Sequence, residues 1–490
     1  MKVLFVYPGY IVREVPLNVM YISAAIEKAG HKSRLFHFSP YRKLAWSQDV
    51  SERIEEGFLE MMNEFKPDLV AFSVMVQDYN ITKHLSWIVR DRYKLPVVWG
   101  GIQPILEPDR SINEPEVDYI CTGEGEKVFP EFLDRLQRGK GSMEVTGIWG
   151  KDAVGNVYRN DRPDLIENLD EVPFPNRDLL EPEYYRAELT GANILTARGC
   201  PFPCSFCQNK ALIEIYKDKG KFIRYRSLDN VFREMEEVIE KYGAPSFYFS
   251  DEMFTLDKRR AIDFCREYKK RINKPFMVQT RADYMDEELA RTLSEAGCTM
   301  VNMAIESGNE HIRNKVLKKS IPTEKIMHAY KLMSDYGMMS SSFNMIGVPG
   351  ETVDTIWDTI DINRRLKPDR ILCSIFMPLP GTELGDYCER TKLITEDVTE
   401  TTNYYSQVTI RNSNLSARTL IGYQGFFDWF VLLPRKFHGL VHVLRVIYQN
   451  IVTPRIPKNP IKRKLREMIV EAVYQMKAHL PQKKFHAKTR

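Results

Sequence analysis

The second half of the chain alternates short apolar, β-branched runs with helical patterns, and it does so six times in succession. Alternation of this kind predicts parallel strands joined by crossover helices, and six units predict a partial barrel over 191–395. The expected strands are Ile194–Ala197, Ser246–Ser250, Phe276–Thr280, Thr299–Ile305, Ser341–Ile346 and Ile371–Phe376. Ligands of such barrels bind at the carboxyl ends of the strands, and the polar clusters of this half follow those ends.

The first 144 residues show the same alternation in a shorter form, with turn-prone glycines after several of the runs. The expected strands are Lys2–Tyr7, Ser33–Phe38, Leu69–Val74, Val97–Trp99 and Val117–Cys121. We therefore expect an α/β fold with a doubly wound, Rossmann-like domain over 1–144. The acid- and proline-rich stretch 145–190 is expected to be a linker, and 396–490 a mostly helical basic region.

Composition supports a globular chain, because 43% of the 490 residues are hydrophobic and 28% are charged. No apolar run reaches the roughly 18 residues of a membrane-spanning helix. The apolar run at the N-terminus covers only Val3–Tyr7, so no secretory signal is expected. Eight cysteines are too few to form a disulfide scaffold in a chain of this length, and this favours a location in the cytoplasm.

Charge is distributed unevenly along the chain. Residues 431–490 hold 14 lysines and arginines against two acids, a net charge of +12, whereas residues 1–430 carry −8. An acidic body argues against nucleic-acid binding. The basic tail, with the aromatic run Phe426–Leu433 before it, suits either a helical cap over the barrel or a segment lying peripherally on anionic lipid.

Three cysteines follow the first strand of the barrel pattern, at Cys200, Cys204 and Cys207. Thiolates bind zinc or iron–sulfur clusters, and the prolines between them require a loop. A structural zinc site needs a fourth ligand, and the nearest other cysteines, Cys121 and Cys265, are distant in sequence. Three thiolates on a [4Fe–4S] cluster instead leave one iron open, which is the interpretation we favour.

A CxxxCxxC sequence after the first strand of a six-fold barrel resembles the radical S-adenosylmethionine enzymes. The resemblance covers roughly residues 190–390 and implies a TIM-like barrel in which Cys200, Cys204 and Cys207 hold a [4Fe–4S] cluster. It further implies that the open iron chelates S-adenosylmethionine, which one electron then cleaves to methionine and a 5′-deoxyadenosyl radical. A protein such as flavodoxin or ferredoxin is the implied electron donor.

The same resemblance assigns S-adenosylmethionine contacts at the strand ends. They are Phe206, Asp251, Glu252, Arg281, Glu306, Ser307 and Gly347. In the family these positions contact the adenine, the amino group, the carboxylate and the ribose. Asp251 could alternatively be a helix N-cap, and Gly347 could simply serve a tight turn.

A doubly wound domain before such a barrel resembles the cobalamin-binding subclass. The corresponding positions are Pro16, Leu17, Ser73, Gly100, Gly101, Gln103, Gly123, Glu124, Gly125 and Glu126. The chain departs from the subclass in two ways: it has no DxHxxG sequence, and it has Gln103 where the family often has histidine. A scaffold domain without a ligand therefore remains the alternative to cobalamin binding.

The resemblance implies a cobalamin-dependent enzyme that methylates an unactivated carbon of a small-molecule or lipid-like substrate, with methylcobalamin as the methyl donor. An oxidative ring-forming enzyme, like the anaerobic cyclase of chlorophyll synthesis, needs the same cofactors and is the alternative. A non-catalytic sensor of redox state or light is a third reading. It would not need Asp251, Arg281 and Glu306 together.

Overall fold

The computed structural model describes residues 1–9, 15–38, 48–186, 191–395, 407–452, 460–478 and 480. Residues 187–190 of the expected linker lie outside this description. So do 396–406, 453–459, 479 and 481–490 of the expected C-terminal region.

The N-terminal half forms a seven-stranded sheet in the order β2-β1-β3-β4-β5-β6-β7. Its strands are β1 (Lys2–Pro8), β2 (Lys32–Phe38), β3 (Leu69–Ser73), β4 (Val97–Gly100), β5 (Tyr119–Cys121), β6 (Ile148–Lys151) and β7 (Val157–Tyr158). The first five strands are parallel, and every residue of β3 is buried, as its unbroken apolar run requires. The doubly wound domain is thus confirmed.

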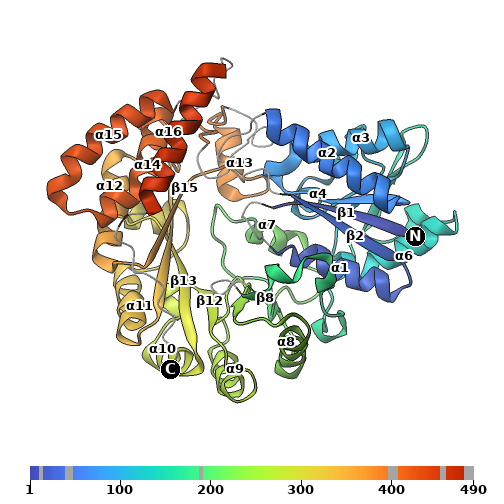
Figure 1. Ribbon diagram of the computed structural model, residues 1–490, viewed down its shortest axis with the longest axis horizontal. Coiled ribbons are helices and arrows are strands. Elements are labelled where there is room, and N and C mark those ends of the chain that lie inside the picture. Colours follow the sequence, from blue (N-terminus) through green and yellow to red (C-terminus); the bar gives the residue numbers. More distant parts are fainter. Residues whose placement is uncertain are drawn as a thin grey trace.

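Helices cover both faces of this sheet, with α2 and α3 on one side and α1 and α6 on the other (Figure 1). The helices are α1 (Leu17–Lys28), α2 (Gln48–Phe65), α3 (Tyr79–Ile88), α4 (Ile102–Leu106), α5 (Pro108–Ile112) and α6 (Gly125–Gln137). The antiparallel strands β6 and β7 extend the sheet beyond residue 144, into the stretch that we expected to be a linker.

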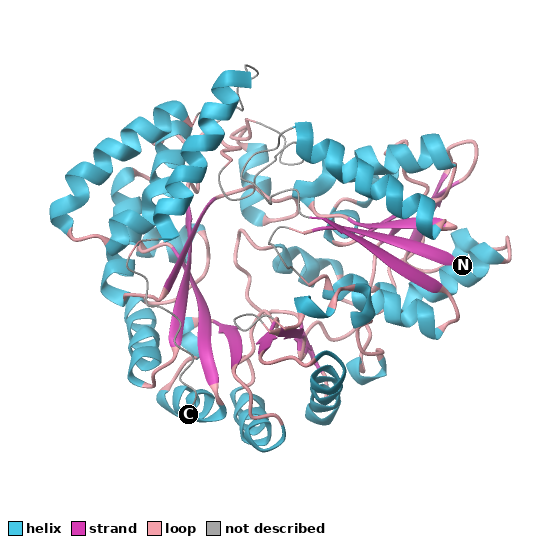
Figure 2. Ribbon diagram, viewed as in Figure 1, coloured by secondary structure: helices cyan, strands magenta, loops and turns pink. Residues whose placement is uncertain are grey.

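The second half forms a six-stranded parallel sheet in the order β15-β14-β13-β12-β11-β8. Its strands are β8 (Ala192–Ile194), β11 (Phe247–Phe249), β12 (Phe276–Thr280), β13 (Cys298–Glu306), β14 (Met339–Ile346) and β15 (Arg370–Ile375). Because β8 and β15 are the two edges of the sheet, the barrel is partial, as predicted. The curved sheet and its outer helices are seen in Figure 2.

Helices follow the barrel strands and lie mainly on the outer side of the sheet (Figure 1). They are α7 (Gln208–Ile215), α8 (Leu228–Tyr242), α9 (Lys258–Arg271), α10 (Glu287–Ala296), α11 (Thr323–Asp335), α12 (Val353–Leu366) and α13 (Glu383–Arg390). A short antiparallel pair, β9 (Ala197–Arg198) and β10 (Arg224–Tyr225), brackets the cysteine loop and α7.

The C-terminal region adds α14 (Ala417–Leu432), α15 (His438–Ile451) and α16 (Pro460–Ala478). The aromatic side chains of α14 do not form a lipid-facing surface: Phe426, Phe427 and Phe430 are buried against β15, α12 and α15. The alternative in which this run lies on a membrane is therefore wrong for these side chains. None of the described helices is long and apolar enough to cross a membrane.

Candidate functional site

The cysteine loop begins where the chain turns sharply after β9. Gly199 has φ +96°, and a Cβ there would overlap the carbonyl oxygen of Phe222, so only glycine fits. The loop ends at Cys207, which is the N-cap residue of α7 and donates its backbone N–H to the carbonyl of Cys204 at 3.1 Å. Both ends of the loop are therefore fixed by regular structure.

Ser205 anchors the middle of the loop to two other parts of the barrel. Its backbone N–H donates to Leu317 O at 3.1 Å, and its hydroxyl donates to Val316 O at 2.6 Å. Leu384, in α13, donates its N–H to Ser205 O at 2.8 Å. These bonds hold the middle of the loop against the barrel.

The three thiols are free, with Cys204 buried and Cys200 and Cys207 half-buried. Burial raises the pKa of each thiol, that of Cys207 to about 11, and the charges of Cys200 and Cys204 add to the shift at Cys207. The thiols therefore lie within electrostatic reach of one another. They are protonated at neutral pH, and metal binding releases those protons.

No single-ion site is built from the cysteines. Over the described ranges, no three His, Cys, Asp or Glu side chains gather closely enough to hold one metal ion. Zinc needs four donors around one point, whereas a cubane cluster takes each thiolate on a different iron. Three soft donors without a fourth protein ligand fit the cluster better than they fit zinc.

Asp251 lies just beyond β11, and its carboxylate is completely buried. It accepts hydrogen bonds from the Thr196 N–H at 2.6 Å, the Thr196 hydroxyl at 2.5 Å and the Ala197 N–H at 3.1 Å. The N-cap alternative is wrong, because α9 begins at Lys258 with Asp257 as its cap. Burial raises the pKa of Asp251, while the Thr196 bonds oppose the shift.

Glu252 is solvent-accessible, yet the protein surrounds it closely enough that desolvation raises the pKa of its carboxyl. The charge of Glu252 in turn raises the pKa of Cys200, which places this carboxylate beside the loop. Of the two acids after β11, Glu252 is thus the one accessible to a ligand.

Arg281, which follows β12, lies over the cysteine loop. Its guanidinium is 3.7 Å from the ring centroid of Phe202, inside the CxxxCxxC sequence. Nε and Nη2 donate to Asp283 at 3.1 and 3.0 Å, and Nη2 also donates to Lys319 O at 2.8 Å. A stacked, bidentate arginine is held rigidly.

Glu306 ends β13 in a left-handed conformation with φ +64°, at an irregularity in the pairing with β14. Lys319 donates to its carboxylate at 2.8 Å, and both side chains are buried. Lys319 and Arg281 lower the pKa of Cys204, whereas Glu306 raises it. Lys319 was not predicted, because the sequence Lys318-Lys319 reads as a solvated surface pair.

Two further predicted contacts lie close by. Phe206 packs on an apolar cluster that includes Met345 and Val348, where β14 ends, and Gly347 directly follows that strand with φ +86°. Ser307 is fully buried, and its hydroxyl accepts from the Asn309 N–H at 3.2 Å, so this side chain serves the turn. Asp251, Arg281, Glu306 and Gly347 thus stand at the ends of four neighbouring strands.

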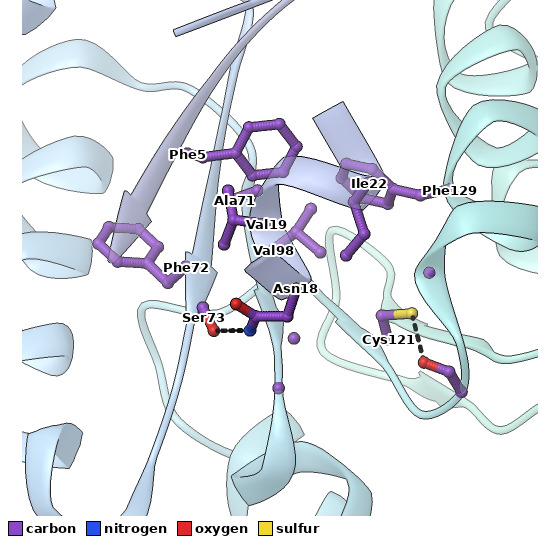
Figure 3. Close-up of a pocket in the computed structure, with 14 residues that line it drawn as sticks. Phe5, Asn18, Val19, Ile22, Ala71, Phe72, Ser73, Val98, Cys121 and Phe129 are labelled. Carbon is purple, nitrogen blue, oxygen red and sulfur yellow. Dashed lines mark hydrogen bonds between the residues drawn. The ribbon is translucent and has the colours of Figure 1, made fainter. Parts of the chain in front are cut away.

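A pocket lies at the carboxyl ends of β3, β4 and β5 (Figure 3). Its lining combines apolar side chains with glycines: Phe5, Asn18, Val19, Ile22, Ala71, Phe72, Ser73, Val98, Gly100, Gly101, Cys121, Gly123, Gly125 and Phe129. Five predicted cobalamin positions are among them. At its rim Asn18 donates to the Ser73 hydroxyl at 3.0 Å.

Glycine is required at the pocket. Gly101 has φ +91°, and a Cβ there would lie 2.9 Å from Val74 O. Pro16 and Leu17 open α1 beside the pocket residue Asn18. Gln103 is fully buried; its Nε2 donates to Glu107 at 2.8 Å, and in the described part of the chain its Oε1 has no hydrogen-bond donor. Gln103 itself is not among the residues that line the pocket.

Glu124 and Glu126 were also predicted to contact cobalamin, but their carboxylates form ion pairs with arginines of the barrel half. Arg198 donates to Glu124 at 2.8 Å and to Glu126 at 2.5 Å, and Arg224 donates to both oxygens of Glu124 at 2.7 and 2.9 Å. Burial alone would raise the pKa of Glu124, but the Arg224 bond and the charges of both arginines outweigh it and lower the pKa. The two carboxylates thus join the halves of the molecule.

The chain is similar in sequence to known proteins in both of its halves. The model of the radical SAM superfamily matches residues 194–362, and that of the B12 binding domain matches residues 9–133. An uncharacterised methyltransferase of Pyrococcus horikoshii is 31% identical over 344 residues, 68% of this chain and 72% of the relative. The anaerobic magnesium-protoporphyrin IX monomethyl ester cyclase of Rubrivivax gelatinosus is 26% identical over 411 residues, 79% and 71% of the two chains.

Among solved structures, the radical S-adenosylmethionine methyltransferase TsrM of Kitasatospora setae, with cobalamin and a [4Fe–4S] cluster bound, has a TM-score of 0.64. The match covers 97% of this chain and 99% of that one, at 19% identity. At this identity the match shows that the two proteins share their fold over nearly their full lengths.

Proposed function

We propose, since the chain belongs to the cobalamin-dependent radical S-adenosylmethionine enzymes, that it methylates an unactivated carbon of a small-molecule or lipid-like substrate. Its cofactors are a [4Fe–4S] cluster, S-adenosylmethionine and cobalamin. When bound, the cluster supplies the electron that cleaves S-adenosylmethionine, and cobalamin carries the methyl group. Which substrate carbon receives that group is the open part of the proposal.

One observation carries the proposal: the loop after β5 contacts the chain on both sides of the cysteine loop. Glu124 binds Arg198, just before the cysteines, and the hydroxyl of Tyr216, just after α7, donates to Thr122 O at 2.9 Å. The neighbouring glycines Gly123 and Gly125 line the pocket. The cobalamin pocket and the cluster loop are therefore built as one unit, as transfer between two cofactors requires.

In this proposal Cys200, Cys204 and Cys207 hold three irons, and the residues around them bind S-adenosylmethionine. The hydrogen bonds of Arg281 to Asp283 and Lys319 use Nε and Nη2, which leaves Nη1 to bind the methionine carboxylate. Glu306, oriented by Lys319, accepts from the ribose hydroxyls. Glu252 accepts from the amino group, a role that suits it better than the fully bonded Asp251.

The pocket of the first half would take an apolar part of cobalamin. Residues around it exclude water, because Phe5, Val19 and Phe129 form its wall. Among the described residues no histidine lines this pocket, so its lining would offer no imidazole to cobalamin.

A second function remains open because of the similarity to the anaerobic cyclase. Cyclisation would need the same cofactor sites and would differ in the product. The proposed partners are an electron donor of the flavodoxin or ferredoxin kind and the substrate, and the proposed location is the cytoplasm.

The experiment is an anaerobic incubation with a reductant, S-adenosylmethionine bearing a deuterated methyl group, and a metabolite extract. We expect 5′-deoxyadenosine together with a product that has gained the labelled methyl. A product that has lost hydrogens or gained oxygen, without the label, would support cyclisation instead. Absence of 5′-deoxyadenosine from protein with an intact cluster would contradict both functions.

A further inference from the structure

Helix α15 turns an apolar face to the solvent. Its inner side packs on α14 through the buried residues Val441 and Tyr448. On an adjoining face of the same helix Leu440, Val443 and Ile447 are 61%, 56% and 51% exposed. These three follow the i, i+3, i+7 spacing of one helical face. The helix is therefore apolar on two adjoining faces, and within the described part of the chain only one of them packs against the protein.

Helix α16 continues this pattern, since Leu465 and Met468 are 49% and 61% exposed. Eight of the 14 exposed large hydrophobic side chains in the described part of the chain lie between Phe437 and Met476. Figure 1 shows α14, α15 and α16 together at the outer end of the barrel half. Single exposed apolar residues are ordinary, but a concentration of this kind marks an interaction surface.

The charge of the same region identifies what it binds. Residues 431–490 carry a net charge of +12, and the exposed side chains of Arg435 and Lys436 stand directly before the apolar face. Lys436 lies 5.2 Å from the ring centroid of Phe437. A second copy of this chain would bring the same positive charge to the contact and be repelled. An anionic lipid surface offers both an apolar layer and the opposite charge.

We propose that the C-terminal apolar face, made of Leu440, Val443 and Ile447, binds the surface of an anionic lipid bilayer. The helices lie in the interface, with the basic side chains at the headgroups. This inference goes beyond the proposed function, because the binding needs neither substrate nor cofactor.

The test is flotation of the full chain with vesicles of phosphatidylcholine alone or with a third of phosphatidylglycerol. Wild type should float with the anionic vesicles only, and added salt should weaken the binding. The variant Leu440→Glu/Val443→Glu/Ile447→Glu should bind at least about tenfold more weakly. Val154→Glu, at an 84% exposed apolar residue of the other half, is the matched control and should bind like wild type.

Equal flotation of wild type and the triple variant would overturn the proposal, as would absence of wild-type binding. A dimer that the triple variant converts to a monomer would assign the face to self-association instead. Formation of 5′-deoxyadenosine in vesicle-free solution should be unchanged in the triple variant. That readout separates loss of lipid binding from loss of the proposed enzyme activity.

Discussion

Lys319 is the residue on which the polar side of the site depends. It is buried, it pairs with Glu306 at 2.8 Å, and its carbonyl accepts from Arg281 at 2.8 Å. The neighbouring Lys318 points to the surface instead and pairs with Glu383. One of two adjacent lysines is thus exposed and the other buried. No pattern in the sequence shows which of the two is buried.

Lys319→Met is expected to impair the enzyme strongly. It leaves the Glu306 carboxylate buried without its cation, a change that costs about 3–5 kcal/mol in comparable buried pairs. Formation of 5′-deoxyadenosine should fall at least about tenfold, because misplaced binding groups lose rate steeply. Lys318→Met removes a surface pair of less than about 1 kcal/mol and is the control. Equal rates for the two variants would refute the role of Lys319.

Asp251 illustrates why some site roles cannot be predicted from sequence. Its position after the second strand pattern of the barrel allowed a cofactor contact or a helix cap. In the structure its carboxylate instead accepts hydrogen bonds from Thr196 and Ala197, which follow the neighbouring strand β8. Partners separated by 55 residues are set by the fold and leave no local pattern.

At the scale of elements, the order of strands and helices could be predicted because periodicity and turn residues are local. Parallel alternation also predicted that Arg281, Glu306 and Gly347 gather at one edge of the barrel. The hairpin β6–β7 was missed, since strands of four and two residues show no period. Contacts between the halves were missed too, because they join charged residues that read as solvated.

The turn from β14 to α12 should make stability depend on pH. Glu351 is fully buried there, accepts from the Gly347 N–H, and has no partner for Oε1 among the described residues. Burial raises the pKa of Glu351 from 4.5 to about 8. The folded state therefore holds a proton that the unfolded state releases. Its stabilising effect is complete below pH 4.5 and is lost as the pH rises to about 8.

Glu351→Gln keeps an acceptor for the Gly347 N–H but cannot ionise. We expect the melting temperature of wild type to fall relative to this variant between pH 5.5 and 8, by several degrees in thermal unfolding. Glu310→Gln, at an exposed carboxylate, is the control and should follow wild type. If the difference in melting temperature between wild type and Glu351→Gln stayed constant from pH 5.5 to 8, the account would be contradicted.

At the scale of the whole molecule, an ionic cluster that is largely but not fully buried joins the halves; it consists of Arg198, Arg224, Glu124 and Glu126. The apolar core is also continuous across the junction, since one cluster includes Phe129 of the first half and Phe249 of the barrel. The two cofactor regions should consequently unfold together.

Glu124→Gln is expected to uncouple the halves, because it leaves Arg198 and Arg224 buried with less compensating charge. A loss of about 3 kcal/mol at the junction should split a single calorimetric transition into two. Arg159→Met breaks an exposed pair with Asp109 inside the first half and should leave the transition single. A single transition in Glu124→Gln at the wild-type temperature would contradict the coupling.

The central claim is that three cysteines hold a cluster whose open iron meets S-adenosylmethionine beside a cobalamin pocket. Anaerobic reconstitution tests it through iron, sulfide and cobalt content and the paramagnetic resonance spectrum of the reduced protein. Wild type should bind the cluster and cobalamin, and S-adenosylmethionine should change the spectrum. Cys204→Ala should lose the cluster spectrum yet retain cobalt, whereas Cys298→Ala, a buried thiol outside the site, should match wild type. A full cluster in Cys204→Ala, or a wild-type spectrum indifferent to S-adenosylmethionine, would contradict the account.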